Sequence, residues 1–332
     1  MSEPVTAILI FISFCIVIFI VALVKKIFYK VMFKKRYYIF PRTSIKGITS
    51  IAMVIALSVA VLILLVIITS NLVGVLFRAF PGTRITIESI LIKIGGLLFG
   101  PFIGMFIGMF TDLLSVTLTA GVFHYGYFIA AMCFGLLSGL VRTIILFSSH
   151  NKLKFAIYTS LSILLVSILA MLYFGFVSTE KLYIPFLPFD IEKEHIIYVI
   201  VSFIFLSIVS IWVFYFMSLK RNNSKKKATN KFGKPSIIKK INLNFFEKYC
   251  PVISCIMITE VLVNVLMMPI FDAEISTLTI NTWLAIRLLL FVPMVFLNLF
   301  IIFPVYAIVS PLVTYDYRKD VVEDASLPLY NL

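Results

Sequence analysis

Six ionisable residues interrupt the long apolar stretches of this chain, and their side chains are the ones able to bind a polar molecule within a membrane. They are Arg84, Glu88, Lys93, Asp112, Glu260 and Arg287. Ionisable residues are costly inside a bilayer and usually mark a ligand or ion pathway. Carboxylates accept hydrogen bonds from paired N–H donors, and Arg or Lys binds anions. The sequence therefore predicts a site for a small molecule that carries polar or charged groups.

Each of these residues also has a purely structural interpretation. Arg84 and Glu88 are four residues apart, so they would share one helix face and could form an ion pair there. Asp112 and Arg287 could each belong to a buried pair between helices. Glu260 could serve packing together with Asn264. These alternatives stay open at the level of the sequence.

The composition of the 332 residues places such a site in a membrane protein. Hydrophobic residues make up 61% of the chain and charged residues 13%, whereas a soluble domain has about 45–50% and about 25%. A soluble globular protein, a disordered protein and a disulfide-rich secreted protein are therefore excluded. The four cysteines lie in or beside apolar stretches without metal-ligand spacing, so we expect packing thiols and no metal site.

Nine apolar runs are candidates for membrane-spanning segments, which need about 20 residues each. They are Val5–Val24, Ile48–Leu76, Ile85–Phe99, Gly100–Thr119, Tyr125–Phe147, Leu153–Val177, Ile196–Met217, Val252–Ile270 and Thr282–Val313. Backbone groups in lipid have to be hydrogen-bonded within their own segment, so each run is predicted to be a helix. The expected fold class is an all-α polytopic membrane protein. The boundary between the third and fourth runs is the least defined one.

The distribution of basic residues predicts the orientation of these helices. The chain has 29 Lys and Arg residues against 15 Asp and Glu residues. Most of the basic residues fall in alternate loops, namely Lys25–Lys46, Arg142–Lys154, Lys220–Lys248 and the C-terminal tail. Cytoplasmic loops are rich in Lys and Arg, so the N-terminus is expected outside the cell and the C-terminus in the cytoplasm. The run Lys220–Lys240 would then face anionic lipid, with nucleic acid as the less favoured partner.

The first apolar run is expected to stay in the protein as an anchor. No positive charge precedes it and no small-residue cleavage site ends it, so it does not have the pattern of a cleavable signal peptide. The chain also has no P-loop and no hydrolase motif, so it is not expected to be an enzyme.

Small residues recur at every fourth position in two regions. Gly96, Gly100, Gly104 and Gly108 form one stripe, Gly135 and Gly139 repeat it, and Ala52, Ala56 and Ala60 form another. Such stripes let helix backbones approach closely. The spacing does not say whether the partner helix belongs to the same chain.

Five motifs follow one another in the first half of the chain. They read Arg84-Ile-Thr-Ile-Glu88, Gly95-Gly-Leu-Leu-Phe-Gly-Pro-Phe-Ile-Gly104, Gly108-Met-Phe-Thr-Asp112, Gly121-Val-Phe-His-Tyr-Gly126 and Gly135-Leu-Leu-Ser-Gly139. Together they resemble the substrate-binding S component of energy-coupling-factor (ECF) vitamin transporters, most closely the folate type. Arg287 with Pro293 looks like the last helix of that family. The resemblance covers Ser44–Phe147 well and Ile253–Pro311 weakly.

The resemblance implies a core of six helices at 44–147 and 252–314, with about three additional transmembrane helices. The additions are an N-terminal helix and basic linker at 1–43, an inserted hairpin at 148–218, a basic cytoplasmic loop at 219–251 and a cytoplasmic tail at 315–332. The chain departs from the family in one loop, which reads His124-Tyr-Gly-Tyr127 in place of His-Pro-Gly-Phe.

The resemblance also implies capture of folate or a reduced folate at the outer face of the cell membrane, without a bound cofactor. The partners would be a scaffold subunit, on which Ala52, Ala56 and Ala60 would dock, and two ATPase subunits. Asp112 or Glu88 would bind the pterin ring, and Arg84, Lys93 or Arg287 the glutamate tail. His124 would belong to the ligand loop. Tyr125, Tyr127 and Trp283 would stack on the ring, or be ordinary residues of the membrane interface.

Three alternatives remain at this level. The ligand could be another vitamin, such as riboflavin, pantothenate or thiamine. The chain could instead be an ion-coupled carrier in which Asp112 and Glu260 titrate. It could also be a membrane enzyme or an assembly protein, although no catalytic constellation favours an enzyme.

Overall fold

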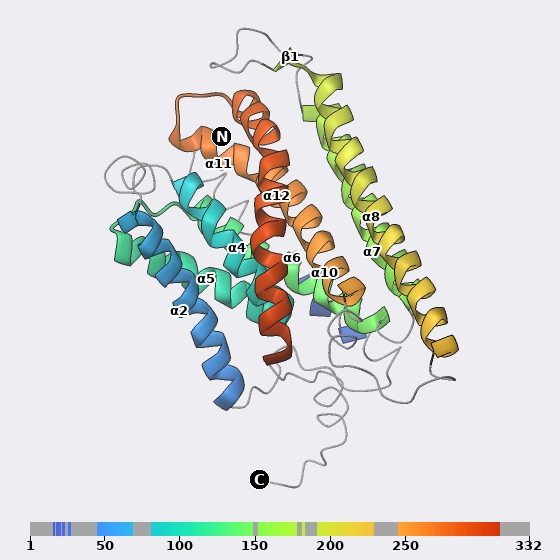
Figure 1. Cartoon of the computed structure of the whole chain (residues 1–332). Coiled ribbons are helices and arrows are strands. Elements are labelled where there is room, and N and C mark those ends of the chain that lie inside the picture. Colours follow the sequence, from blue (N-terminus) through green and yellow to red (C-terminus); the bar gives the residue numbers. More distant parts are fainter. Residues whose placement is uncertain are drawn as a thin grey trace.

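The chain folds as a bundle of long helices, which confirms the all-α polytopic membrane class (Figure 1). A computed structural model describes residues 45–68, 81–148, 152–177, 181–182, 191–228 and 245–312, and a few residues between 16 and 27. In this described part, seven helices are long and apolar enough to cross a membrane. Most of the predicted first span, Val5–Val24, lies outside the described residues.

The first half of the bundle contains α2 (Ile45–Ile68), α4 (Pro81–Phe99), α5 (Pro101–Thr119) and α6 (Tyr125–Ser148). The chain breaks between α4 and α5 at Gly100, whose φ of 94° lies in the region that favours glycine. Pro101 then occupies the first turn of α5, where its missing N–H costs no helical hydrogen bond. Helix α4 is not among the seven apolar spans, because it carries Arg84, Glu88 and Lys93.

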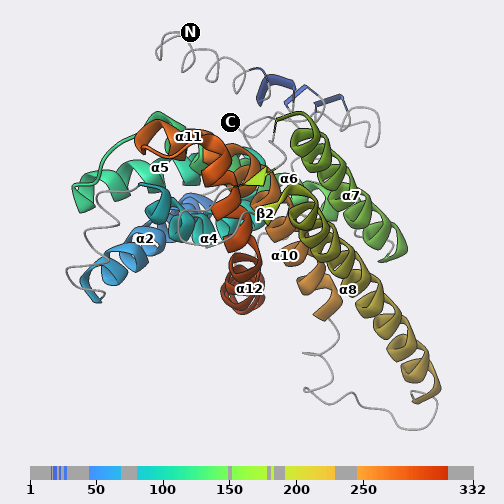
Figure 2. The same ribbon diagram turned by 90° about the horizontal axis from the view of Figure 1, so that it is seen from above.

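Helices α7 (Lys152–Val177) and α8 (Lys193–Ala228) pair along one side of the bundle. A two-residue antiparallel pairing of β1 (Lys181–Leu182) with β2 (Ile191–Glu192) joins their ends. Figures 1 and 2 show this pair on the side of the bundle away from α2. Helix α8 continues to Ala228, so part of the segment predicted as a basic loop at 219–251 is helical.

The second half runs through α10 (Phe245–Thr259), the π-helix η2 (Glu260–Met267), α11 (Met268–Ile275) and α12 (Ile280–Leu312). The first three are continuous and exceed the predicted span Val252–Ile270 at both ends. The predicted span ended at Ile270, before Asp272 and Glu274. The helix continues past that point because Asp272 is buried against Arg287, which neutralises its charge.

The glycine stripe packs within this chain. An added Cβ would lie 2.4 Å from the Gly135 carbonyl oxygen if placed on Gly104, and 2.2 Å from the Ala131 carbonyl oxygen if placed on Gly108. A Cβ on Gly135 would lie 1.9 Å from the Gly104 carbonyl oxygen. These distances are too short for any side chain, so α5 and α6 approach backbone to backbone. The partner of the stripe is therefore α6, a point that the spacing had left open.

Helix α2 lies at the edge of the bundle with one face unpaired. Ala52, Ala56 and Ala60 are exposed, while Val59 and Leu62 on the same helix are buried. The buried face contacts α4 and α5. The alanine stripe is thus on the exposed face of α2.

Candidate functional site

Two separate groups of buried charges lie in the bundle. The first, which we call the Arg84 cluster, joins Arg84 and Glu88 of α4 to Thr111, Asp112 and Ser115 of α5. Arg84 Nη2 donates a hydrogen bond of 2.9 Å to Asp112 Oδ1, and its Nε lies 3.1 Å from Glu88 Oε1. All five side chains are buried. The ion pair between Arg84 and Glu88 that their spacing left open is therefore present, and Asp112 joins it.

The loop before α6 closes over the Arg84 cluster. Arg84 Nη1 lies 3.4 Å from the carbonyl oxygen of Val122. A Cβ at Gly121 would lie 2.8 Å from the same nitrogen, so glycine lets the loop approach the guanidinium. The Gly121-containing motif and the Arg84 motif thus meet in space.

The Arg84 cluster contains polar atoms that have no hydrogen-bond partner. They are Arg84 Nε, both carboxylate oxygens of Glu88, Asp112 Oδ2, Thr111 Oγ1 and Ser115 Oγ. Arg84 Nε is within ion-pair distance of Glu88, but its N–H does not point at the oxygen. Buried polar atoms normally have partners, because leaving one unpaired costs about 1–3 kcal/mol. The cluster can therefore accept additional hydrogen-bond donors.

The second group, which we call the Arg287 network, links helices far apart in the sequence. Lys93 of α4 donates to Glu260 of η2 and to Asn298 of α12. Glu260 also accepts a hydrogen bond of 2.7 Å from Asn264. Every carboxylate oxygen of Glu260 thus has a donor. Lys93 and Glu260 belong to this network and not to the Arg84 cluster.

Arg287 anchors the other end of this network. Its Nε and Nη2 donate to the two carboxylate oxygens of Asp272 at 2.8 and 3.0 Å, a bidentate arrangement. Its Nη1 donates to Asn264, and Tyr127 donates its hydroxyl hydrogen to Asp272. The partner of Arg287 is therefore Asp272, as in the structural interpretation of a buried pair between helices.

Asp272 and Asn298 are the members of this network that sequence reasoning missed. Asn298 could have been found, because it is a lone amide inside a long apolar run. Asp272 gave no such signal, since it lies just beyond the predicted end of a span. Nothing in its spacing points to Arg287, which follows after a loop and on another helix.

The predicted aromatic residues already have partners. Tyr127 is fully buried and its hydroxyl is bound to Asp272. Tyr125 donates its hydroxyl hydrogen to Glu274 at 2.7–2.8 Å. The indole N–H of Trp283 donates to the Ser276 hydroxyl. In this conformation the hydroxyls and the indole N–H hold α6, α11 and α12 together near the Arg287 network.

His124 is the last residue of the loop before α6 and lies beside this aromatic group. Its Nδ1 accepts a hydrogen bond of 3.2 Å from the Gly126 backbone N–H, and its Nε2 lies 3.2 Å from Glu274. Burial lowers the pKa of the His124 imidazole below its usual value, while the Glu274 carboxylate opposes that shift. The neutral form fits these contacts, with the proton on Nε2.

This state of His124 predicts a pH dependence of stability. An unfolded His with a pKa of about 6.5 takes up a proton that the folded residue resists, so stability falls as the pH drops from about 7 to about 5. We expect the apparent melting temperature of His124→Gln in detergent to fall less over this range than that of the unmodified protein. Equal slopes for both proteins would contradict the assignment.

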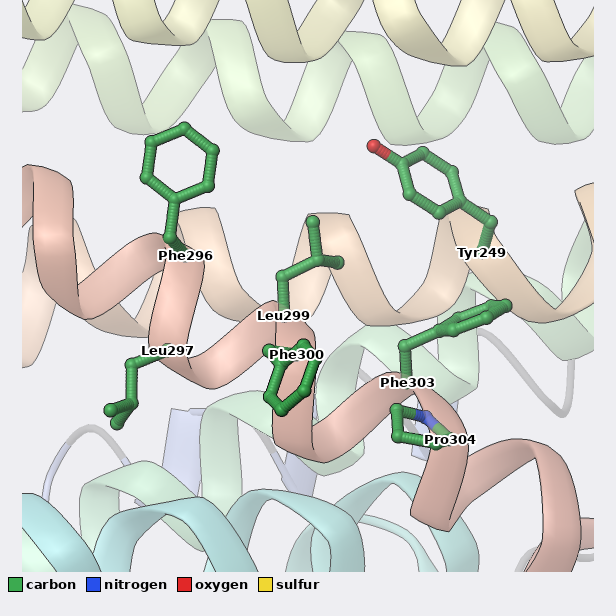
Figure 3. A pocket seen from close by; sticks show the side chains of 7 residues that line it. All are labelled: Tyr249, Phe296, Leu297, Leu299, Phe300, Phe303 and Pro304. Atoms are coloured by element: carbon green, nitrogen blue, oxygen red, sulfur yellow. The ribbon is translucent and has the colours of Figure 1, made fainter.

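An apolar groove on the flank of α12 is a different kind of feature (Figure 3). Its volume is about 760 Å³, and it is lined by Tyr249, Phe296, Leu297, Leu299, Phe300, Phe303 and Pro304. Phe300 is 82% exposed, and none of the lining side chains is charged. Because a polar vitamin needs charged or hydrogen-bonding partners, the groove does not fit such a ligand. The Arg84 cluster remains the candidate site.

Comparison with known proteins finds a relative but gives no function. No protein-family profile matches the chain, and no solved structure matches it. A protein of Mycoplasma pneumoniae (strain ATCC 29342 / M129 / Subtype 1), named "Uncharacterized protein MG098 homolog", is 29% identical over 331 residues. The match covers 90% of this chain and 68% of the relative. That name carries no ligand or activity, so the function has to be argued from the residues.

Proposed function

We propose that this chain is the substrate-binding S component of an ATP-driven ECF-type vitamin importer, with folate or a reduced folate as its ligand. It captures the vitamin at the outer face of the cell membrane. It then delivers the vitamin by associating with a scaffold subunit and two ATPase subunits. The ordered motifs of the first half of the chain are the basis of this proposal.

The unpartnered oxygens of the Arg84 cluster are the observation that carries it. Glu88 and Asp112 present three carboxylate oxygens without a hydrogen-bond donor. The pterin ring offers adjacent N–H groups, which a carboxylate accepts as a pair. Both carboxylates belong to the motifs on which the resemblance rests. The ring therefore supplies the donors that the cluster lacks.

The glutamate tail of a folate has to compete for its cations. Arg84 faces Glu88 and Asp112, Lys93 faces Glu260, and Arg287 faces Asp272. Of these three, Arg84 lies in the same cluster as the proposed ring partners. A tail that binds Arg84 would release Asp112 to accept the ring. Ligand binding is thus expected to rearrange the cluster.

The helix arrangement supports the proposed orientation and docking surface. In Figure 1 the start of α2, the end of α8 and the end of α12 lie at the lower side of the bundle. In the sequence, the basic segments are next to these helix ends. We place this side in the cytoplasm, with the N-terminus outside. The exposed stripe of Ala52, Ala56 and Ala60 is the proposed contact with the scaffold subunit, because small side chains allow close and reversible helix contact.

The role of Asp112 can be tested by binding. We expect Asp112→Asn to weaken folate binding about 10- to 100-fold, since hydrogen bonds to a charged group contribute about 1.5–3 kcal/mol. Titration calorimetry on the purified full chain measures the change. Thr117→Val is the matched control on the same helix, because the Thr117 hydroxyl bonds only to carbonyls of its own helix. Unchanged affinity in folded Asp112→Asn would remove this residue from the site.

A further inference from the structure

The charges of the Arg84 cluster do not balance. Arg84 contributes one positive charge, and Glu88 and Asp112 contribute two negative charges if both are ionised. The Arg287 network does balance, since Lys93 and Arg287 face Glu260 and Asp272. With both carboxyl groups ionised, the Arg84 cluster would therefore carry one excess negative charge in a buried position.

No other charged group in the described residues supplies the missing positive charge. Arg84 and Asp112 are the charged groups that act on Glu88, and Arg84 is the one that acts on Asp112. On the helices packed around them, Arg142 lies in the last two turns of α6, at the other end from the cluster. In α12, Arg287 is bound to Asp272. In α2, Lys46 lies in the first turn.

The hydroxyls beside the carboxylates give a second, independent observation. A buried Ser or Thr in a helix commonly donates to a carbonyl of the preceding turn, as Thr119 does to Ser115 and Thr143 does to Gly139. Thr111 and Ser115 make no such bond, although both are fully buried. Ser115 lies one helical turn from both Thr111 and Asp112, and its hydroxyl is within hydrogen-bond reach of the Glu88 carboxyl group. Both hydroxyls thus make no bond to the helix backbone, and that of Ser115 can form a hydrogen bond with a carboxyl group of the cluster.

We propose that Glu88 and Asp112 together bind one proton when the site holds no vitamin. The proton makes one carboxyl neutral, which brings the net charge of the cluster to zero. The neutral carboxyl then donates its O–H to an oxygen of the other carboxylate or of Ser115. A single proton thus removes the excess charge and provides partners for unpaired oxygens. An alkali cation would have to sit beside the Arg84 guanidinium, which repels it.

The bound proton makes vitamin capture sensitive to pH, a consequence that rests on the proposed function. When ring N–H groups donate to both carboxylates, these become ionised and the shared proton leaves to the outer solution. The vitamin keeps its own protons. Release of one proton per ligand makes the dissociation constant fall about tenfold for each unit of rising pH, as long as the empty site is protonated.

Infrared spectroscopy of the ligand-free full chain tests the proton directly. A protonated carboxyl group has a C=O stretching band separate from that of a carboxylate. We expect this band at a pH of about 7, at which an ordinary carboxyl group is ionised, and its loss in Glu88→Gln or Asp112→Asn. Glu274→Gln, which changes a carboxyl outside the cluster, should leave the band in place. Ser115→Ala keeps both carboxyls and should shift the band, so it tests the proposal even if the charge variants do not fold.

Two results would overturn the proposal. A spectrum whose carboxyl region is the same in the unmodified protein, the charge variants and Ser115→Ala would show that the cluster holds no proton. A rise in melting temperature with Na⁺ over choline at constant pH, lost in Glu88→Gln, would assign the missing charge to an alkali cation. Neither measurement uses a vitamin, so failure of the folate proposal would leave both results interpretable.

Discussion

Replacing Arg287 with Met is expected to destabilise the protein by about 3–5 kcal/mol, the cost of breaking a buried ion pair by removing one partner. Arg287 makes a bidentate contact with Asp272 and also binds Asn264. Its loss leaves the fully buried Asp272 carboxylate without its counter-charge. The apparent melting temperature in detergent, compared with that of the unmodified protein, measures the effect.

A double variant separates the ion pair from the bulk of the side chains. Asp272→Asn combined with Arg287→Met removes both charges. The double variant should therefore lose less stability than the sum of the losses in the two single variants. Tyr127 can still donate to the asparagine oxygen. Strictly additive losses, or a small loss in Arg287→Met alone, would show that the pair does not hold α11 to α12.

Replacing Gly135 with Val is expected to cost about 3 kcal/mol or more, at or above the upper end of the range for overpacking. A Cβ at this position would lie 1.9 Å from the Gly104 carbonyl oxygen and 2.9 Å from the Met105 nitrogen. These are backbone atoms, so no side chain can rotate away to make room. Helices α5 and α6 would have to separate along their whole contact, and the melting temperature should fall strongly.

Ser202→Val is the matched control, because it enlarges an exposed small residue on α8. It should leave the melting temperature nearly unchanged. If Gly135→Val were as stable as this control, the close contact between α5 and α6 would be wrong. That result would also weaken the evidence for the geometry of the Arg84 cluster, since its residues come from α4 and α5 and are covered by the loop that leads into α6.

The sequence predicted the local features of the fold better than the long-range ones. Helix positions follow from apolar length, and the break at Gly100 follows from the glycine and proline there. The pairing of Arg84 with Glu88 follows from their helical spacing. Each of these depends on residues close together in the chain, so one sequence is enough to predict them.

The composition of the buried networks could not be predicted in the same way. Lys93 is five residues from Glu88 in the chain, yet it binds Glu260, which is 167 residues away. Which of several carboxylates faces a given cation depends on the rotation of each helix and on its depth in the bundle. Neither can be predicted from the spacing of residues along the chain. The same holds for Asp272, whose burial depends on a helix that continues beyond its apolar run.

These networks divide the ionisable residues into two kinds. The Arg287 network is neutral and its carboxylates have donors, which is the pattern of a structural element. The Arg84 cluster has two carboxyl groups for one basic group and contains unpartnered oxygens, which is the pattern of a site that binds something. The proposed transport function therefore rests on the smaller group of residues, at the meeting point of α4, α5 and the loop before α6.

The most direct test of the proposed function is a ligand screen on the purified full chain in detergent. Thermal stability is followed with folate, 5-formyltetrahydrofolate, riboflavin, thiamine and pantothenate, because a tight ligand stabilises the folded state by mass action. We predict a large rise in melting temperature with a folate and none with the other vitamins. A rise with a different vitamin would contradict the folate assignment. No rise with any of them, in protein shown to be folded, would contradict vitamin binding itself.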